Sequence, residues 1–247
     1  MLTQYQNATA ALLQNPSAPT PLYSTSSLTA WINTARGQLA GEAECVVAMG
    51  TLTLAAATIV YPFSSITFPT SSAVSGVQGP INVRQAWCSV ASGQVWVRPR
   101  PWPWFSLYEW NNPVPQSGPP QVWSQYGQGA LGSIYVSPPP DQAYTLPVDC
   151  VCLPIALVSD STVEAIPALW QDAVPFFAAY MALLSAQSTA RLDDAMKYFQ
   201  LYSEFVARAR NAATPSVLPG IYSQVPSPVR ANQLGIAPSP RQPAGGG

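Results

Sequence analysis

The stretch at residues 173–186, AVPFFAAYMALLSA, constrains the fold most, because it is apolar on every face and must therefore be buried. A helix of this length rises ~1.5 Å per residue and spans roughly 21 Å, short of the ~30 Å hydrocarbon core of a membrane. A proline is tolerated only in the first turn of a helix. Pro175 lies in the first turn if the helix begins just after Asp172. We therefore predict a core helix that begins near Pro167 or with Asp172 as its N-cap, and no membrane span.

Three further helices are predicted at the two ends of the chain. Residues 26–45 begin with Ser26 or Ser27 as a candidate N-cap, and their apolar positions recur every three to four residues. A shorter helix is expected at 3–15, before Pro16. The last helix, 191–211, is predicted to pack antiparallel to the apolar helix. Its expected inward positions are Leu192, Met196, Phe199, Phe205 and Val206.

Between the helical ends, short β-like runs alternate with Gly, Pro, Ser and Asn, which is typical of antiparallel strands joined by turns. The predicted strands are 51–54, 57–63, 65–68, 81–90, 94–99, 105–110, 132–138 and 144–158. The pattern predicts an α+β fold with an inserted antiparallel β-rich domain at 49–158. The N- and C-terminal helices, in residues 1–48 and 159–212, are expected to form one discontinuous helical bundle.

The C-terminal residues 213–247 are predicted to be an extended Pro-rich arm. Seven prolines fall in the last 34 residues, and a segment of this composition does not build a core of its own. After Glu204 the chain carries four arginines and no acid, so the arm is basic. Two hypotheses remain open: a tail without a role, or an arm that becomes ordered on a partner.

Composition limits the chemistry that this chain can perform. Histidine is absent, which removes the commonest general base and the commonest transition-metal ligand, and Lys197 is the sole lysine. Charged residues make up 9% of the chain, against about 25% in an ordinary soluble domain. A surface with so few charges suits burial against other subunits. We expect no catalytic residue, no cofactor and an assembled protein.

Motifs that resemble sites have simpler interpretations. Cys45, Cys88, Cys150 and Cys152 contain no C-x-x-C spacing and are predicted to be buried, reduced thiols. Adjacent carboxylates such as Asp193 and Asp194 diverge by about 100° on a helix, so no metal site is expected. The glycines of 127–132 match G-x-G-x-x-G, but a strand-like run follows instead of a helix, which indicates a turn between strands.

The stretch RPRPWPWFSLYEW, residues 98–110, interleaves prolines with large rings. Proline restricts its first part to an extended edge or corner strand, where the rings would fill space between the β insert and a neighbour. The candidate interface residues are Trp102, Trp104, Phe105 and Trp110. A stacking platform for sugars or bases is the alternative, although the arginines flank the rings and do not alternate with them.

The order of these pieces resembles a known family. A helix with WINTARGQLAGEAECV precedes a β region with YPF, RPRPWPWFSLYEWNNP and GQGALGSIYVSPPPDQAYTLPVDCVCLP. Then comes IPALWQDAVPFFAAYMALLSAQSTARLDDAMKYFQLYSEFVARAR. Over most of residues 26–212 this order resembles the head-to-tail adaptor (connector, or head-completion) proteins of tailed bacteriophages. The β insert is longer than in the minimal helical members of that family.

The resemblance implies a structural virion protein, made in the host cytoplasm and located in the neck between capsid and tail. Such proteins form a ring, usually of twelve copies, beneath the portal; the ring extends the DNA channel, through which the genome passes without sequence-specific binding. Tail or nozzle proteins attach to it, and C-terminal segments commonly hold the portal. The corresponding candidates here are Arg230, Leu234, Ile236 and Arg241.

Two alternatives of other classes stay open. A tail-associated carbohydrate or receptor-binding module would use the tryptophans Trp102, Trp104, Trp110 and Trp123. A hydrolase would use Asp141 and Asp149, or Glu109. The N-terminus lacks the basic start and apolar run of a signal peptide, so an intracellular product without a membrane partner is expected.

Overall fold

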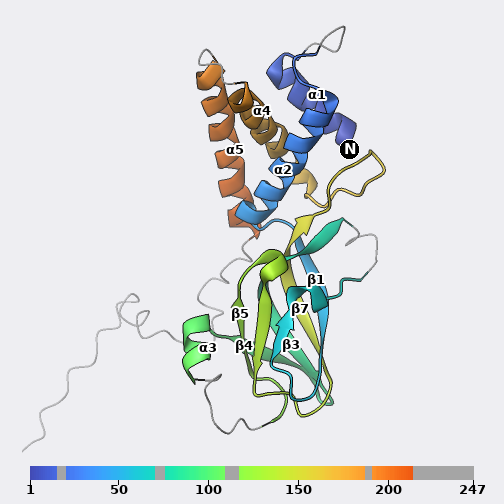
Figure 1. Ribbon diagram of the computed structural model, residues 1–247, viewed down its shortest axis with the longest axis vertical. Helices are drawn as coiled ribbons and strands as arrows, with labels where there is room; N and C mark the ends of the chain where they lie inside the picture. The colour runs from blue at the N-terminus through green and yellow to red at the C-terminus, as the bar shows by residue number, and fades with distance from the viewer. Residues whose placement is uncertain (16–20, 70–75, 109–116, 187–190, 214–247) are drawn as a thin grey trace, which may run out of the picture. The chain divides into compact units, whose positions relative to one another are not determined.

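The computed structural model describes residues 1–15, 21–69, 76–108, 117–186 and 191–213 (Figure 1). Its α-helices are α1 (Leu2–Leu13), α2 (Thr25–Ala43), α3 (Trp102–Tyr108), α4 (Ala173–Ser185) and α5 (Leu192–Ala213). Its strands are β1 (Val47–Leu54), β2 (Val60–Pro62), β3 (Val77–Val90), β4 (Gly93–Pro99), β5 (Val122–Tyr126), β6 (Ser133–Ser137) and β7 (Tyr144–Pro154). The predicted α+β class is confirmed, and Arg230, Leu234, Ile236, Arg241 and Trp110 lie outside the described residues.

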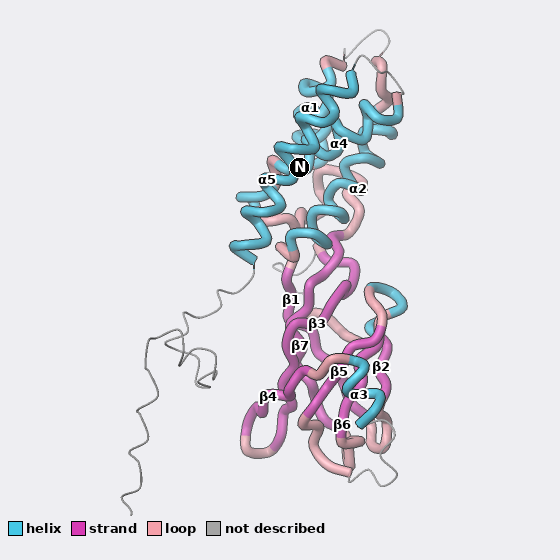
Figure 2. The backbone as a smooth tube through the Cα atoms, turned by 90° about the vertical axis from the view of Figure 1, so that its left-hand side faces the viewer, coloured by secondary structure: helices cyan, strands magenta, loops and turns pink. Residues whose placement is uncertain are grey.

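Helix α4 is the centre of the helical part, where α1, α2 and α5 pack against it (Figure 2). Its Ala178, Ala179 and Ala182 are fully buried, because small side chains let the neighbouring helices approach closely. Asp172 is the N-cap of α4, which was one of the two predicted starts; the other was Pro167. The antiparallel pairing of α4 with α5 is also confirmed by three ring contacts. These are Phe176–Phe205 at 6.0 Å, Phe177–Tyr202 at 4.6 Å and Tyr180–Phe199 at 5.0 Å.

Helix α2 begins earlier than predicted. Its N-cap is Ser24, whose hydroxyl accepts a hydrogen bond from the Ser27 backbone N–H at 3.1 Å, so the prediction of Ser26 or Ser27 was wrong. Ser24 is extended at φ −69° and ψ 154°, as an N-cap must be, while Ser26 and Ser27 already lie inside the helix. The apolar positions that recur every three to four residues in α2 include Leu28, Ile32 and Leu39, and these three side chains are buried, as that spacing predicts.

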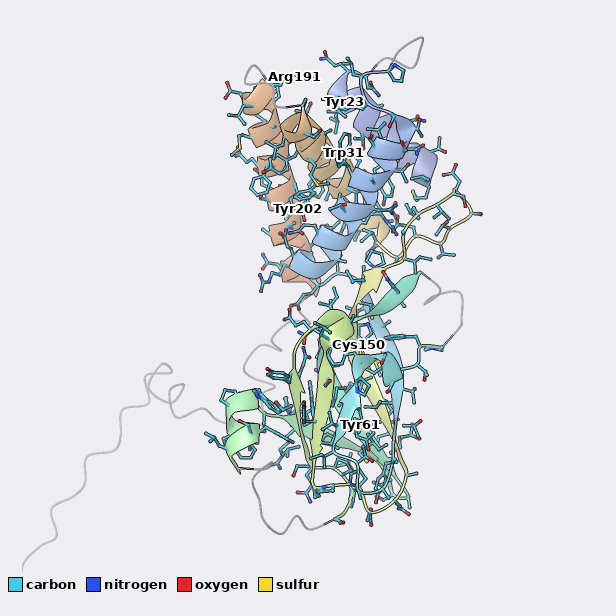
Figure 3. All side chains as sticks on the ribbon, in the orientation of Figure 1. Tyr23, Trp31, Tyr61, Cys150, Arg191 and Tyr202 are labelled. Carbon is cyan, nitrogen blue, oxygen red and sulfur yellow. The ribbon has the colours of Figure 1, made fainter. Side chains whose placement is uncertain are left out.

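Helix α5 turns part of its predicted face to the core, where Phe205 and Val206 are partly buried as predicted. Leu192 and Met196 are 49% and 53% exposed, so their predicted inward orientation was wrong, whereas Phe199 is 38% exposed and still contacts Tyr180 of α4. Tyrosines take the core positions instead, because each hydroxyl reaches a partner across the interface. Tyr202, which lies between α5 and α2 in Figure 3, donates to Glu42 Oε2 at 2.9 Å. Tyr198 donates to the Leu12 carbonyl at 2.9 Å.

The seven strands of the described residues form one curled sheet in the order β1-β7-β3-β4-β5-β6-β2 (Figure 1). All neighbours are antiparallel except β4 and β5, which pair in parallel at Arg98↔Val122 and Pro99↔Trp123. The prediction of a purely antiparallel insert was therefore wrong, and β5 was not predicted at all. A parallel pair needs a long crossover connection, and the segment that contains α3 supplies it between β4 and β5.

Part of the proline-tryptophan stretch is helical. The predicted edge strand and the strand at 105–110 were wrong where α3 forms. Both Pro101 and Pro103 fall at the start of this helix, where a missing N–H costs nothing, and the Phe105 N–H donates to the Pro101 carbonyl at 3.0 Å. Pro101 and Pro103, on which the prediction of a strand rested, therefore mark the start of helix α3.

The glycines at 127–132 form the turn between β5 and β6, as predicted. Gly127 has φ 75° and Gly129 has φ 57°, the left-handed region that glycine enters without strain. Gly132 is required for space, because a Cβ there would collide with the Phe63 ring. These glycines therefore have a structural role in a tight β-turn region.

Candidate functional site

Two of the aromatic residues predicted as an interface, Trp102 and Phe105, pack against tyrosine rings of their own chain. The Trp102 ring lies 4.9 Å from that of Tyr126 and 4.5 Å from that of Tyr135, measured between centroids. Phe105 is 1% exposed and packs 6.1 Å from Tyr135. Trp102 and Phe105 thus fix α3 on β5 and β6. Trp104 is half-buried beneath the guanidinium of Arg100, 4.8 Å from its ring centroid.

A groove that the sequence did not reveal lies beside β4. Its volume is about 700 Å³, and Val95, Trp96, Pro120, Val122 and Tyr144 contribute to its lining. Val95 and Trp96 are about half exposed, at 50% and 53%. Because β4 meets β5 only at its last residues, the part of β4 that carries these two side chains borders the groove. The continuous apolar run 95–97 was the available signal, but a run of this kind ordinarily indicates a buried strand.

A buried ion pair fastens α2 to the chain that leaves the sheet after β7. The Arg36 guanidinium donates to Glu164 through Nη2 at 2.8 Å and through Nε at 3.0 Å. Arg36 Nη1 also donates to the Ile155 carbonyl at 2.7 Å. Asn33 completes the contact, accepting from the Leu157 N–H at 2.8 Å and donating to the Leu157 carbonyl at 3.1 Å. These bonds set the exit of β7 against the helical part.

The carboxylates considered for hydrolysis do not converge. Asp141 accepts a hydrogen bond from the Tyr144 hydroxyl at 2.7 Å, at the start of β7. Asp149 pairs with Arg84 at 3.6 Å. Asp149 lies five residues beyond Tyr144 along β7, a separation of about 17 Å at ~3.4 Å per residue. Burial raises the pKa of Asp149, while Arg84 lowers it. Glu109 lies outside the described residues.

All four cysteines are free and buried, as predicted. Cys150 lies within the sheet (Figure 3). Burial raises the pKa of Cys45 to about 11 and that of Cys152 to about 12, and it also raises the pKa values of Cys88 and Cys150. A reactive thiol needs a lowered pKa and exposure, so these cysteines act as small apolar side chains in the core.

Two negative findings concern the described part of the chain. Among these residues, no group of three or more His, Cys, Asp or Glu side chains is arranged to hold a metal ion. None of the helices described is both long and apolar enough to cross a membrane.

Comparison with protein families gives a match over nearly the whole chain. The family model described as SU10 adaptor protein matches residues 2–230, which include every described element. No curated protein matches the chain. The family name denotes an adaptor, a structural component of the head-tail region of a bacteriophage and generally not an enzyme. The chain belongs to the SU10 adaptor protein family.

Proposed function

We propose that this chain forms a ring that joins the portal to the tail and extends the DNA channel of the virion. The observation that carries the proposal is the family match over residues 2–230. The low charge supports it, because a ring subunit buries much of its surface against its neighbours. A ring of twelve copies is expected, in the virion neck, with genomic DNA passing through without sequence-specific contacts.

The chain divides its tasks among three parts in this proposal. Residues 1–48 and 159–212 build the wall of the ring as a helical bundle, and residues 49–158 present the β insert to tail or nozzle proteins. The Arg36–Glu164 pair supports this division, because it ties α2 to the segment that returns from the insert. A subunit held in this way would transmit a defined orientation from the ring to the insert.

Residues 213–247 are proposed to bind the portal as an extended arm. Arg230 and Arg241 would contact acidic or carbonyl groups, and Leu234 and Ile236 would enter apolar pockets. Extended segments bind in this manner by adding to a sheet edge or lying in a groove. The composition supports the proposal, since seven prolines in 34 residues favour an extended chain.

The β insert offers the surface proposed for the tail-side partner. The groove beside β4 is lined by Val95, Trp96 and Pro120, and apolar clefts with exposed aromatic side chains are common centres of protein interfaces. Arg100, whose guanidinium lies over the Trp104 ring, lines a second hollow on the same insert. We include Trp110 in the proposed contact because the sequence predicts it as an interface residue.

The geometry does not favour the carbohydrate-binding alternative. A stacking platform needs open ring faces, but Trp123 is 4% exposed and Trp102 packs between Tyr126 and Tyr135. Of the proposed sugar-binding tryptophans in the described residues, Trp104 alone is neither in the core nor enclosed by these tyrosines, and Arg100 covers it.

Binding to the portal protein of the same phage tests the proposal. We would compare the full chain with a version that ends at Ala213, where α5 ends, by biolayer interferometry on immobilised portal rings. The full chain is expected to bind and the shortened chain to lose at least tenfold in affinity, about 1.4 kcal/mol. A matched control replaces Arg230 and Arg241 by Ala in the full chain. Equal binding by all three proteins would contradict the role of the arm, and no binding by any would contradict the adaptor proposal.

A further inference from the structure

One side of α5 carries a stripe of exposed side chains, three of them large, and of these Phe199 also contacts Tyr180 of α4. Leu192, Met196, Phe199 and Ser203 recur at spacings of four, three and four residues, which places them on one side of the helix. The first three are 49%, 53% and 38% exposed. Met196, Phe199 and Ser203 also line a shallow groove of about 570 Å³, together with the polar Asp193, Lys197 and Gln200. We name these four residues the α5 stripe.

The outer face of α2 carries a stripe of small side chains with the same spacing. Ala30, Thr34, Gly37 and Gly41 lie opposite the buried residues of α2 and so face away from α4. We name these four residues the α2 stripe. Neither stripe contains a charged residue.

The two glycines of the α2 stripe have no explanation within their own chain. At Gly37 and at Gly41, no atom lies within 4 Å of the place that a Cβ would occupy. Both lie inside a regular helix, where a glycine costs about 1 kcal/mol relative to alanine. A cost without an internal benefit is expected where another chain must approach the helix backbone closely.

We propose that the α5 stripe of one copy packs against the α2 stripe of the next copy. Each stripe is about 16 Å long, because its first and last residues are eleven positions apart along the helix. The large side chains of the α5 stripe would fill the open space above the small side chains of the α2 stripe. The two stripes are different surfaces of one chain, so the contact is head-to-tail. Repetition of a head-to-tail contact gives a ring when the rotation closes.

A second copy is the occupant that both stripes require together. A symmetric contact between two α5 stripes would bury the exposed apolar residues but leave Gly37 and Gly41 without a role. The inference names the subunit contact of the proposed ring and so rests on the proposed function. Three helical turns cover far less than the ~800 Å² per partner of a standard interface, so a single contact of this kind is weak. In a closed ring the same contact is repeated between all neighbouring subunits, and the repeated contacts together stabilise the ring.

Disulfide trapping tests this contact without portal protein. The four native cysteines are buried, so an introduced surface cysteine reacts selectively. Gly37→Cys would be mixed with Met196→Cys, which opposes it if the helices run antiparallel, or with Phe199→Cys, which opposes it if they run parallel. Both mixtures use the full chain under mild oxidation. Asn7→Cys, on the exposed face of α1, replaces Gly37→Cys in the matched control.

One of the two Gly37→Cys mixtures is expected to give about tenfold more cross-linked dimer than its Asn7→Cys control. The product should be the mixed dimer, because neither introduced thiol faces its own kind across a head-to-tail contact. Mixed-dimer yields equal to the control, or a predominant Met196→Cys or Phe199→Cys homodimer, would overturn the proposal. Because no portal protein is present, either result leaves the portal-binding test of the proposed function independent.

Discussion

Arg36 and Glu164 lie 128 residues apart in the sequence and form an ion pair at 2.8 Å between Nη2 and Oε1. Their side chains are 1% and 7% exposed, so the pair is removed from water. Each charge is therefore tolerated only because the other is present. This pair, together with Asn33, sets where the chain returns from the β insert to the helices.

Replacement of Arg36 by Met is expected to destabilise the fold by about 3–5 kcal/mol, because the Glu164 carboxylate would stay buried without its partner. The double variant Arg36→Met/Glu164→Met should recover most of this loss. Arg208→Met, which breaks the exposed pair with Glu204, is the control and should cost about 0–1 kcal/mol. Urea unfolding followed by circular dichroism measures all three, and equal effects of Arg36→Met and Arg208→Met would show that the buried pair has no special role.

Trp102→Ala is expected to destabilise the protein by roughly 2–3 kcal/mol, because the ring fixes α3 against Tyr126 and Tyr135. Trp104→Ala removes a ring of similar size that is half-buried beneath the Arg100 guanidinium, and should cost less, about 1 kcal/mol. Thermal unfolding monitored by near-ultraviolet circular dichroism compares the two. A larger loss with Trp104→Ala would contradict the anchoring role assigned to Trp102.

Stability should fall as the pH rises above about 9. The buried thiols keep their protons in the folded state, because burial raises the pKa of Cys45 to about 11 and that of Cys152 to about 12. In the unfolded chain a thiol ionises near 8.5, so the unfolded state binds fewer protons over this range. Each such thiol lowers the free energy of unfolding by up to about 1.4 kcal/mol per pH unit.

The urea midpoint measured between pH 7.5 and pH 10 checks this dependence. Cys45→Ala should flatten it by the share of one thiol, whereas the exposed substitution Ser26→Ala should leave it unchanged. A midpoint that does not move with pH would contradict the burial of protonated thiols in the core.

Two glycines should respond in opposite directions to the same change. Gly132→Ala is expected to cost about 1–3 kcal/mol, because the new methyl group would collide with the Phe63 ring. Gly37→Ala is expected to gain up to about 1 kcal/mol in the unassociated chain, since the site is open and helical. Urea unfolding of the dilute protein measures both, and a loss with Gly37→Ala would show that this glycine serves its own subunit.

The helices whose apolar residues recur at a regular spacing were predictable from the sequence. Which side of each helix is buried was predictable only where the most apolar side chains are the ones that pack in the core. Leu28, Ile32 and Leu39 are buried as their spacing predicts. In α5 the same argument held for Phe205 and Val206 but failed for Leu192 and Met196, because Tyr198 and Tyr202 satisfy their hydroxyls across the helix interfaces and take core positions. The hydrogen-bond partners that decide this exchange lie far away in the sequence.

The β insert was predictable in kind and less so in detail. The two longest strands, β3 and β7, fell near their predicted positions. Strand β5 contains Ser124 and Gln125 and lacks a clear period, so the parallel pair that it forms with β4 had no signal. Helix α3 was missed because Pro101 and Pro103 were taken as strand signals, although proline is equally suited to the start of a helix.

Mass photometry of the full chain mixed with the portal ring of the same phage tests the central claim most directly. The account predicts one complex whose added mass equals about twelve copies of the 26.3 kDa chain, and loss of that complex for the version that ends at Ala213. A portal that gains no mass, or that gains the same mass with both versions, would contradict the account of an adaptor ring held by its C-terminal arm.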